Sequence, residues 1–194
     1  MALTVNRPVG LRARPRGPVT SWLAPETEFG SPRVVGVVSR RGAWLGVTTP
    51  TLPDGQLGWI RRGDPAVNAG RVRWSLRADL SERRLVLRRG AKVVRRLTVA
   101  IGAAGSPTPT GRFAVTDKLA GGRYSAAYGC CILALSGHQP NLPAGWRGGN
   151  RLAIHGTYGE VGLPATAGCL RASNDEMAEL MRRVPLGTPV FIGR

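Results

Sequence analysis

Short apolar stretches separated by turn residues make up the first third of the chain. Four valines between positions 34 and 38 precede a hairpin signal at Arg41–Gly42, and a second apolar stretch follows at 44–47. The tripeptide Pro-Asp-Gly at 53–55 is a strong turn signal. Because short strands joined by tight turns are typical of small barrels and sandwiches, this pattern predicts a small β domain over roughly residues 8–62.

A second set of short strands follows residues 62–71, a segment rich in Gly, Pro and Asn that we interpret as a linker. Apolar residues on both sides of Arg89–Gly90 predict a hairpin. Further strands are predicted at 97–101, 113–115, 152–154 and 190–192. The chain is therefore expected to be mainly β, with one domain at 1–71 and a second at 72–194.

One helix is well specified near the C-terminus. Ser173 can cap its first turn, and Glu176 three residues later completes a capping box. An apolar face with helical spacing follows, made of Met177, Leu180, Met181 and Val184. Pro185 is expected to end the helix, and we interpret the two methionines as core residues.

The chain is strongly basic, with 28 Lys and Arg against 11 Asp and Glu and a formal net charge of +17. Such a charge favours anionic partners, among them nucleic acid, anionic lipid and acidic cell-wall polymers. The basic residues form scattered pairs and no long run, which also fits a solvated basic surface. We expect no nucleic-acid partner and keep an acidic wall polymer as an alternative to the solvated surface.

The first twenty residues are basic but lack the apolar core of a signal peptide. Either the protein is cytoplasmic, or the chain begins after a removed export segment. No stretch approaches the roughly 20 apolar residues that span a bilayer.

Three cysteines are present, and two of them, Cys130 and Cys131, are adjacent. Neighbouring cysteines rarely bond to each other because the ring is strained, so we expect both to be buried and unbonded. A zinc site formed by these two residues and His138 lacks standard ligand spacing. The Gly-rich loop at 102–111 lacks the lysine of a phosphate-binding loop. No metal or cofactor is therefore expected.

The third cysteine, Cys169, is a candidate nucleophile. An apolar run ends at His155–Gly156, and a loop with Gly and Pro separates this pair from Cys169, so the chain can return beside the histidine. An imidazole can take the proton of a thiol and hold the thiolate in an ion pair. The backbone amides of Gly168 and Cys169 could then donate to a developing oxyanion. Spacing alone leaves open a structural histidine and a buried structural cysteine.

From Trp74 to Arg194 the chain resembles the catalytic domain of bacterial L,D-transpeptidases of the YkuD family. The segments that carry the resemblance are GSPTPTG, IHGT, AGCLR and VPLGTPVFI. The resemblance implies a β-sandwich with a short helix, and it implies that Cys169 is the nucleophile, His155 the base and the Gly156 carbonyl the third member. The N-terminal segments FGSPRVVGVVSRRGAWLGV and GWI resemble bacterial SH3-like barrels. The family often has a histidine where this chain has Ala167.

The resemblance also implies a substrate-covering flap near Tyr124 and Tyr128, although core packing of these tyrosines is an equal alternative. Arg171 could contact a stem-peptide carboxylate or lie on the surface. The sequence thus predicts an exported, cysteine-dependent L,D-transpeptidase of the cell envelope. Such an enzyme would form 3→3 cross-links between peptidoglycan stem peptides through a thioester, and carbapenems would inhibit it. The alternative is a wall-binding protein of the same fold without turnover.

Overall fold

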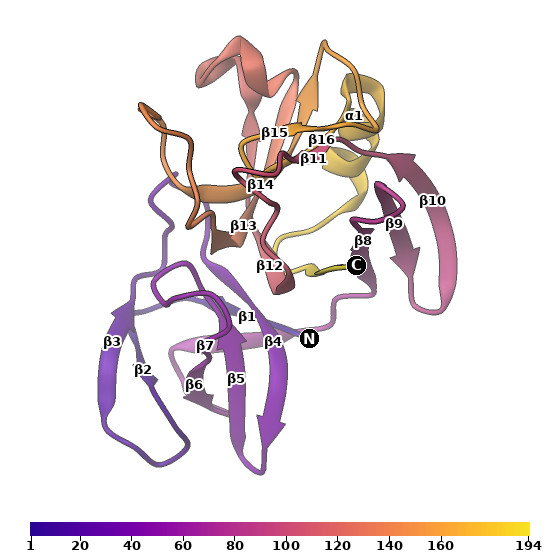
Figure 1. Ribbon diagram of the computed structural model, residues 1–194. Coiled ribbons are helices and arrows are strands. Elements are labelled where there is room, and N and C mark those ends of the chain that lie inside the picture. The colour runs from indigo at the N-terminus through magenta and orange to yellow at the C-terminus, as the bar shows by residue number, and fades with distance from the viewer.

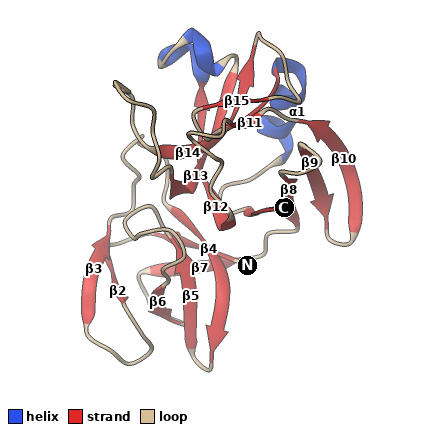
Figure 2. Cartoon of the chain, viewed as in Figure 1, coloured by secondary structure: helices blue, strands red, loops and turns tan.

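The computed structural model describes all 194 residues. Figure 1 shows two β-rich parts, an N-terminal part drawn in indigo to magenta and a C-terminal part above it. The chain is mainly β with a single α-helix, as the sequence predicts (Figure 2). No helix in the protein is both long enough and apolar enough to cross a membrane.

The N-terminal part is a seven-stranded antiparallel sheet. Its strands are β1 (Ala2–Val5), β2 (Val9–Arg12), β3 (Val19–Leu23), β4 (Val34–Arg41), β5 (Trp44–Thr48), β6 (Gly58–Arg61) and β7 (Val67–Gly70). They are ordered β3-β2-β6-β5-β4-β1-β7 around a core of 11 buried apolar residues. The predicted turn at Arg41–Gly42 joins β4 to β5, where Gly42 has a φ of +57° that favours glycine.

Two features of this part differ from the sequence-based expectation or go beyond it. Val67–Gly70, which we assigned to a linker, forms β7 and pairs with β1, because the chain returns to complete the sheet before it leaves the domain. Strand β1 lies before the residues from which we predicted the domain. The strand order runs as one open series from β3 to β7, so the closed barrel implied by the SH3 resemblance stays a prediction.

The C-terminal part is built on an eight-stranded sheet ordered β10-β9-β8-β17-β12-β13-β14-β16. Its strands are β8 (Trp74–Asp79), β9 (Arg84–Arg89), β10 (Lys92–Thr98), β12 (Gly111–Ala120), β13 (Cys131–His138), β14 (Arg151–Thr157), β16 (Leu170–Ser173) and β17 (Pro189–Gly193). The core of 19 buried residues draws on strands from both ends of this order. The two halves of the sheet therefore enclose one core, which is sandwich packing.

The predicted hairpin at Arg89–Gly90 joins β9 to β10, but the predicted strand at 97–101 is split. Strand β10 ends at Thr98, and the chain then exchanges two backbone hydrogen bonds between Ala100 and Arg171, at 2.9 and 3.0 Å. After this change of partner, β11 (Ile101–Gly102) pairs with β15 (Pro164–Thr166). The GSPTPTG loop and the segment before Cys169 are thereby held side by side.

The predicted helix is present as α1 (Asn174–Arg183). The Ser173 hydroxyl accepts a hydrogen bond from the Glu176 amide and contacts the Glu176 carboxylate at 2.9 Å, so the predicted capping interaction is confirmed. Met177 and Leu180 are fully buried in the core, as predicted, whereas Met181 is half-buried and packs against the core. Two short 3-10 helices, η1 (Gly121–Arg123) and η2 (Ala126–Tyr128), lie between β12 and β13.

Candidate active site

The strand register brings His155 and Cys169 to one face of the sheet. Strand β14 pairs in parallel with β16, with Ile154 opposite Leu170 and His155 opposite Arg171. Ile154 and Leu170 are fully buried in the core. Because side chains alternate along a strand, His155 and Arg171 point to the other face. Cys169 directly precedes β16, and it lines the same pocket as these two residues. We expected the histidine at the end of a strand. It lies inside β14 instead, because β14 continues to Thr157.

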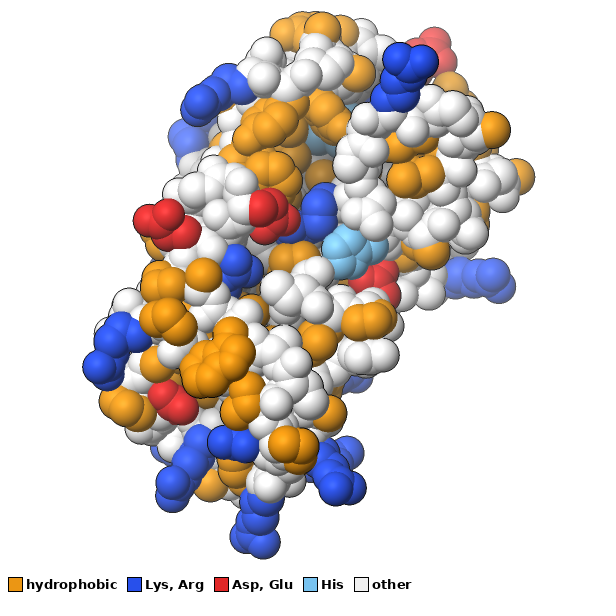
Figure 3. All heavy atoms as spheres, turned by 90° about the vertical axis from the view of Figure 1, so that its left-hand side faces the viewer, with side chains coloured by type: hydrophobic (Ala, Val, Ile, Leu, Met, Phe, Trp, Pro, Cys, Tyr) orange, Lys and Arg blue, Asp and Glu red, His pale blue; other side chains and the backbone are white.

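A pocket of about 450 Å³ opens on this face. Its lining includes five residues singled out from the sequence: Tyr124, Tyr128, His155, Cys169 and Arg171. Figure 3 shows a hollow in the upper half of the molecule, with hydrophobic side chains beside it. Ala167, where the family often has a second histidine, also lines the pocket.

His155 is held as a neutral base. Its Nδ1 lies 2.8 Å from the carbonyl oxygen of Gly156. Because a carbonyl can only accept, Nδ1 carries the hydrogen, and Nε2 is left with a free lone pair. The pKa of His155 is lowered to about 4, because burial and, to a smaller extent, the charge of Arg171 outweigh the hydrogen bond to Gly156, which raises it. The imidazole is therefore uncharged at neutral pH.

This depressed pKa makes the protein's stability depend on pH. The folded-state pKa, about 4, lies below the ordinary histidine pKa of 6.5, so the unfolded chain takes up the proton first as the pH falls. The stability is fully present above pH 6.5 and is lost towards pH 4, by about 3 kcal/mol. Urea titrations at pH 7 and pH 4 measure this loss. Between these two pH values the unfolding free energy of the parent should fall by about 3 kcal/mol more than the unfolding free energy of His155→Gln. An equal fall in both proteins would contradict the shift.

Cys169 is a free cysteine whose thiol is protonated at rest. Burial raises its pKa, and the Ala153 amide and the charge of Arg171 only partly oppose this effect. The nearest backbone acceptor is the Arg151 carbonyl, 3.9 Å from Sγ. With a neutral imidazole and a raised thiol pKa, the resting pair is uncharged. The arrangement therefore favours transfer of the thiol proton to the imidazole during attack, and the ion pair of thiolate and imidazolium stays a prediction.

The backbone around the nucleophile offers one free donor where we expected two. The Gly168 amide donates to Thr166 Oγ1 at 3.0 Å, and the Thr166 hydroxyl donates to the Cys169 carbonyl at 2.6 Å. The Cys169 amide donates to no acceptor in the structure. Of the two expected oxyanion donors, the Gly168 amide is therefore already hydrogen-bonded to Thr166, and the Cys169 amide is the one left free.

Gln139 is a site residue that the sequence did not reveal. It is buried, and its Nε2 donates to the Pro107 and Ser106 carbonyls at 2.9 and 3.3 Å. It also lies directly under Gly168, where an added Cβ would come within 1.8 Å of Nε2. The Gln139 side chain thus lies between the GSPTPTG loop and Gly168, the residue before Cys169, and contacts both. A glutamine after an apolar strand carries no motif, so no sequence signal pointed to this role.

Gly168→Ala should both destabilise the protein and slow acylation. Gly168 has a φ of +112°, which disfavours side chains, and the new methyl group would collide with Gln139. Strain and overpacking together should lower the unfolding free energy by roughly 2–4 kcal/mol. Urea denaturation measures this loss, and the rate of carbapenem adduct formation measures the displacement of Cys169. A variant with parental stability and rate would show that the turn is not constrained.

Tyr124 and Tyr128 belong to the pocket and not to the core. The Tyr128 ring packs edge-on against the His155 ring, with centroids 4.9 Å apart, and Tyr124 is 49% exposed at the rim. Burial and the neighbouring Cys169 raise the pKa of Tyr128, so its hydroxyl stays neutral at physiological pH. Arg171 also lines the pocket, and its buried Nε has no hydrogen-bond partner.

The expectation for the other two cysteines was wrong. Cys130 and Cys131 form a disulfide with each other, and both are only half-buried. The surroundings fix this stretch of chain: Gly129 has a φ of +59°, and the Cys130 amide donates to Asn174 Oδ1 at 2.9 Å. This local constraint overrides the general disfavour for a ring between neighbours. No group of three or more His, Cys, Asp or Glu residues could hold a metal ion.

His138, the other histidine, lies outside the pocket. Its backbone amide donates to the Asp54 carboxylate at 3.0 and 3.2 Å, and its Nδ1 lies 3.7 Å from the same group. It therefore contributes to the contact between the two domains. Of the two histidines in the chain, His155 is the one that lines the pocket with Cys169.

The family model of the L,D-transpeptidase catalytic domain, YkuD, matches residues 73–192, more than half of the chain. The chain belongs to the YkuD family. The YkuD domain thus contains the pocket and both candidate catalytic residues. Its first matched residue lies between β7, the last strand of the N-terminal sheet, and β8.

Two curated relatives agree with this assignment, and a solved structure shares the fold. YqjB of Bacillus subtilis, whose name places it among L,D-transpeptidases, is 35% identical over 106 residues, or 49% of this chain and 57% of that protein. ErfK/SrfK of Salmonella typhimurium is 31% identical over 118 residues, or 53% of this chain and 38% of that protein. The chain spans about half the length of these curated relatives. An L,D-transpeptidase from Mycobacterium smegmatis shares the fold, with a TM-score of 0.50 and 16% identity over 82% of each chain.

Proposed function

We propose that this YkuD protein is a cysteine-dependent L,D-transpeptidase acting on peptidoglycan stem peptides. The observation that carries the proposal is the pairing of Cys169 with His155 in one pocket, with the Gly156 carbonyl fixing the tautomer that leaves Nε2 free. This is the arrangement that a buried thiol needs to become a nucleophile. The names of the relatives support the same activity.

The first half-reaction forms a thioester. Cys169 Sγ attacks the carbonyl carbon after the L-centre of the diamino acid in a tetrapeptide stem, while His155 Nε2 takes the thiol proton. The C–N bond to the terminal D-residue then breaks, and the imidazolium returns the proton to the departing amine. The free amide of Cys169 is the donor available to the oxyanion.

The second half-reaction transfers the acyl group. An amine on a neighbouring stem attacks the thioester carbon and gives a proton to His155 Nε2, which returns it to the leaving Cys169 sulfur. A new amide bond forms and the C–S bond breaks, so that a 3→3 cross-link results without ATP. Because the pKa of Cys169 is raised, the regenerated sulfur takes up its proton readily.

Arg171 is proposed to bind a carboxylate of the stem peptide. It lines the pocket two residues after the nucleophile, and its buried Nε lacks a partner. A guanidinium with unsatisfied donors is suited to a carboxylate. We further propose that the protein is exported to the cell envelope, where its net charge of +17 would attract anionic wall polymers.

The test of this function is product analysis. The protein is incubated with a disaccharide-tetrapeptide, and the products are separated and sequenced by mass spectrometry. The proposal requires release of the terminal D-residue and a cross-linked dimer joined between the third residues of two stems. Binding of the substrate without either product would favour a wall-binding protein of the same fold. Ala167 in place of the family's second histidine, and the Gly168 amide that is already hydrogen-bonded to Thr166, are compatible with that alternative.

A further inference from the structure

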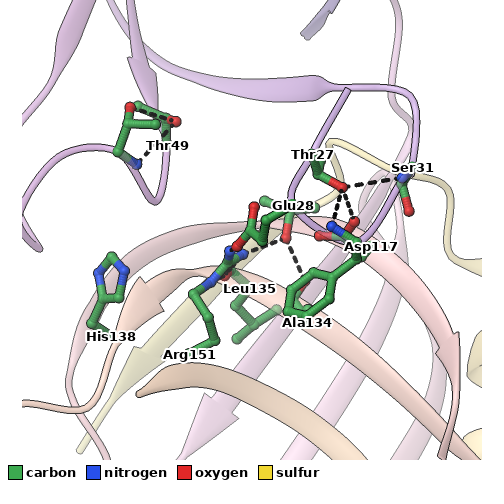
Figure 4. Close-up of polar contacts among 12 residues, drawn as sticks. Thr27, Glu28, Ser31, Thr49, Asp117, Ala134, Leu135, His138 and Arg151 are labelled. Atoms are coloured by element: carbon green, nitrogen blue, oxygen red, sulfur yellow. Dashed lines mark hydrogen bonds and ion pairs between the residues drawn. The ribbon is translucent and has the colours of Figure 1, made fainter. Parts of the chain in front are cut away.

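A loop of the N-terminal domain contacts Arg151, a residue that lines the catalytic pocket. Residues 24–33 connect β3 to β4 and contact the C-terminal sheet beside β14. Figure 4 shows Glu28 directed at Arg151 and Thr27 directed at Asp117, each pair joining the two domains. Neither the family model, which begins at residue 73, nor any sequence motif assigns a role to this loop.

Side chains of the loop hold its backbone through hydrogen bonds. The buried Arg33 joins its two ends, donating from Nε to the Ala24 carbonyl at 2.7 Å and from NH2 to the Glu26 carbonyl at 2.5 Å. The Thr27 hydroxyl accepts the amides of Phe29 and Ser31, at 3.3 and 3.1 Å. It also donates to the fully buried Asp117 carboxylate at 2.5 Å. A loop with its backbone fixed in this way can position what it touches.

Arg151 connects the loop to the nucleophile, because it contacts both. The guanidinium forms an ion pair with Glu28 and donates to the Leu135 carbonyl and to Thr116 Oγ1, at 2.6 and 2.7 Å from NH2. Its centre lies 5.7 Å from the centroid of the Phe29 ring. The backbone carbonyl of the same residue is the one 3.9 Å from Cys169 Sγ. One residue therefore carries contacts to both domains and to the reactive thiol.

Phe29 extends the same connection to the rim of the pocket. Its ring packs edge-on against Tyr124, with centroids 6.0 Å apart. Together with Tyr124, Tyr128 and Arg151 it lines a mainly apolar annex of about 150 Å³, and these three residues also line the catalytic pocket. A side chain of the N-terminal domain thus forms part of a wall that continues into the catalytic pocket.

We propose that loop 24–33 is a positioning element of the active site, acting on Cys169 through Arg151 and on substrate binding through Phe29. This inference rests on the proposed transpeptidase function. Glu28 acts through Arg151 and is a positioning residue that does not touch the substrate. Phe29 sets how well the annex receives a small apolar group of the stem peptide.

The test compares the full-length parent with Glu28→Gln and Phe29→Ala, using release of the terminal D-residue from disaccharide-tetrapeptide. Glu28→Gln should lower kcat about 3–10-fold with KM unchanged, since small displacements of reacting groups reduce the rate. Phe29→Ala should raise KM about 5-fold and change kcat little, because it removes binding surface and not alignment. Glu179→Gln is the matched control. It removes a carboxylate on α1 that pairs with Arg95 on β10 and with Arg183 on α1, away from both pockets, and it should match the parent.

A double-mutant cycle distinguishes positioning from general weakening of the interface. If Glu28 acts through Arg151, Glu28→Gln should have no further effect on kcat in an Arg151→Gln background. Thermal melting of each variant shows whether a lower kcat reflects unfolding. If Arg151→Gln does not fold, the single Glu28→Gln variant still tests the positioning role, which requires a lower kcat with an unchanged KM.

The two proposals fail in distinguishable ways. If the parent turns over and Glu28→Gln and Phe29→Ala behave like Glu179→Gln, the loop has no positioning role and the transpeptidase function stands. If the parent does not turn over, the alkylation rate of Cys169 by iodoacetamide still reports the position of the thiol. A rate in Glu28→Gln equal to that of Glu179→Gln would then overturn the positioning of Cys169 as well, whereas a rate changed several-fold in Glu28→Gln alone would support it.

Discussion

Cys169→Ala is expected to abolish covalent adduct formation with both a tetrapeptide stem and a carbapenem. The substitution removes the only free thiol of the chain, since Cys130 and Cys131 are bonded to each other. The fold should persist, because the residue is half-buried and loses a single heavy atom from a pocket wall. The change in unfolding free energy should therefore stay within about 1 kcal/mol.

Intact mass and circular dichroism of Cys169→Ala check this expectation together. The variant should keep the parental spectrum and melting temperature and show no mass increase. An adduct of parental size on the alanine variant would place the nucleophile elsewhere and remove the basis of the proposed mechanism.

His155→Gln is expected to lower the acylation rate roughly 10²–10⁴-fold, the usual contribution of a general base. Glutamine keeps a hydrogen-bond donor near the Gly156 carbonyl but has no basic lone pair to take the thiol proton. Because the pKa of Cys169 is raised, little thiolate is present without a base at neutral pH. The loss should therefore shrink as the pH rises and the thiol ionises unaided.

Stopped-flow measurement of carbapenem acylation between pH 6 and pH 10 resolves this pattern. His138→Gln is the matched control, since His138 contacts Asp54 and does not line the pocket. It should acylate at the parental rate. A large loss in His138→Gln with none in His155→Gln would reverse the assignment of the base.

Much of the site could be predicted because its elements are local in sequence. The His-Gly pair on an apolar strand and the Gly-Cys pair after a glycine-containing loop are contiguous motifs. Their meeting follows from the register of two parallel strands, Ile154 opposite Leu170. The helix was equally accessible, since Ser173 and Glu176 signal its start and the apolar spacing defines its buried face.

The residues that escaped prediction act through long-range contacts. Gln139 contacts the loop at Ser106 and Pro107, more than 30 residues earlier, and supports Gly168. Arg151 meets Glu28 across 123 residues. No periodicity or spacing signals either contact, because each depends on how separate strands and loops are stacked.

The electrostatic state of the catalytic pair also required the structure. The sequence suggested an ion pair of thiolate and imidazolium, the usual way to activate a cysteine. Burial of both groups favours an uncharged resting pair, since the pKa of His155 is lowered to about 4 and that of Cys169 is raised. The depth of a residue in a pocket is set by its neighbours in space, which the order of residues along the chain does not give.

The most direct test of the mechanism is the intact mass of the parent during turnover of a disaccharide-tetrapeptide. The proposed thioester predicts a mass increase equal to the donor without its terminal D-residue. After proteolysis this increase should map to the peptide that contains Cys169. The absence of any such adduct, with the tetrapeptide and with a carbapenem alike, would contradict a cysteine-dependent L,D-transpeptidase.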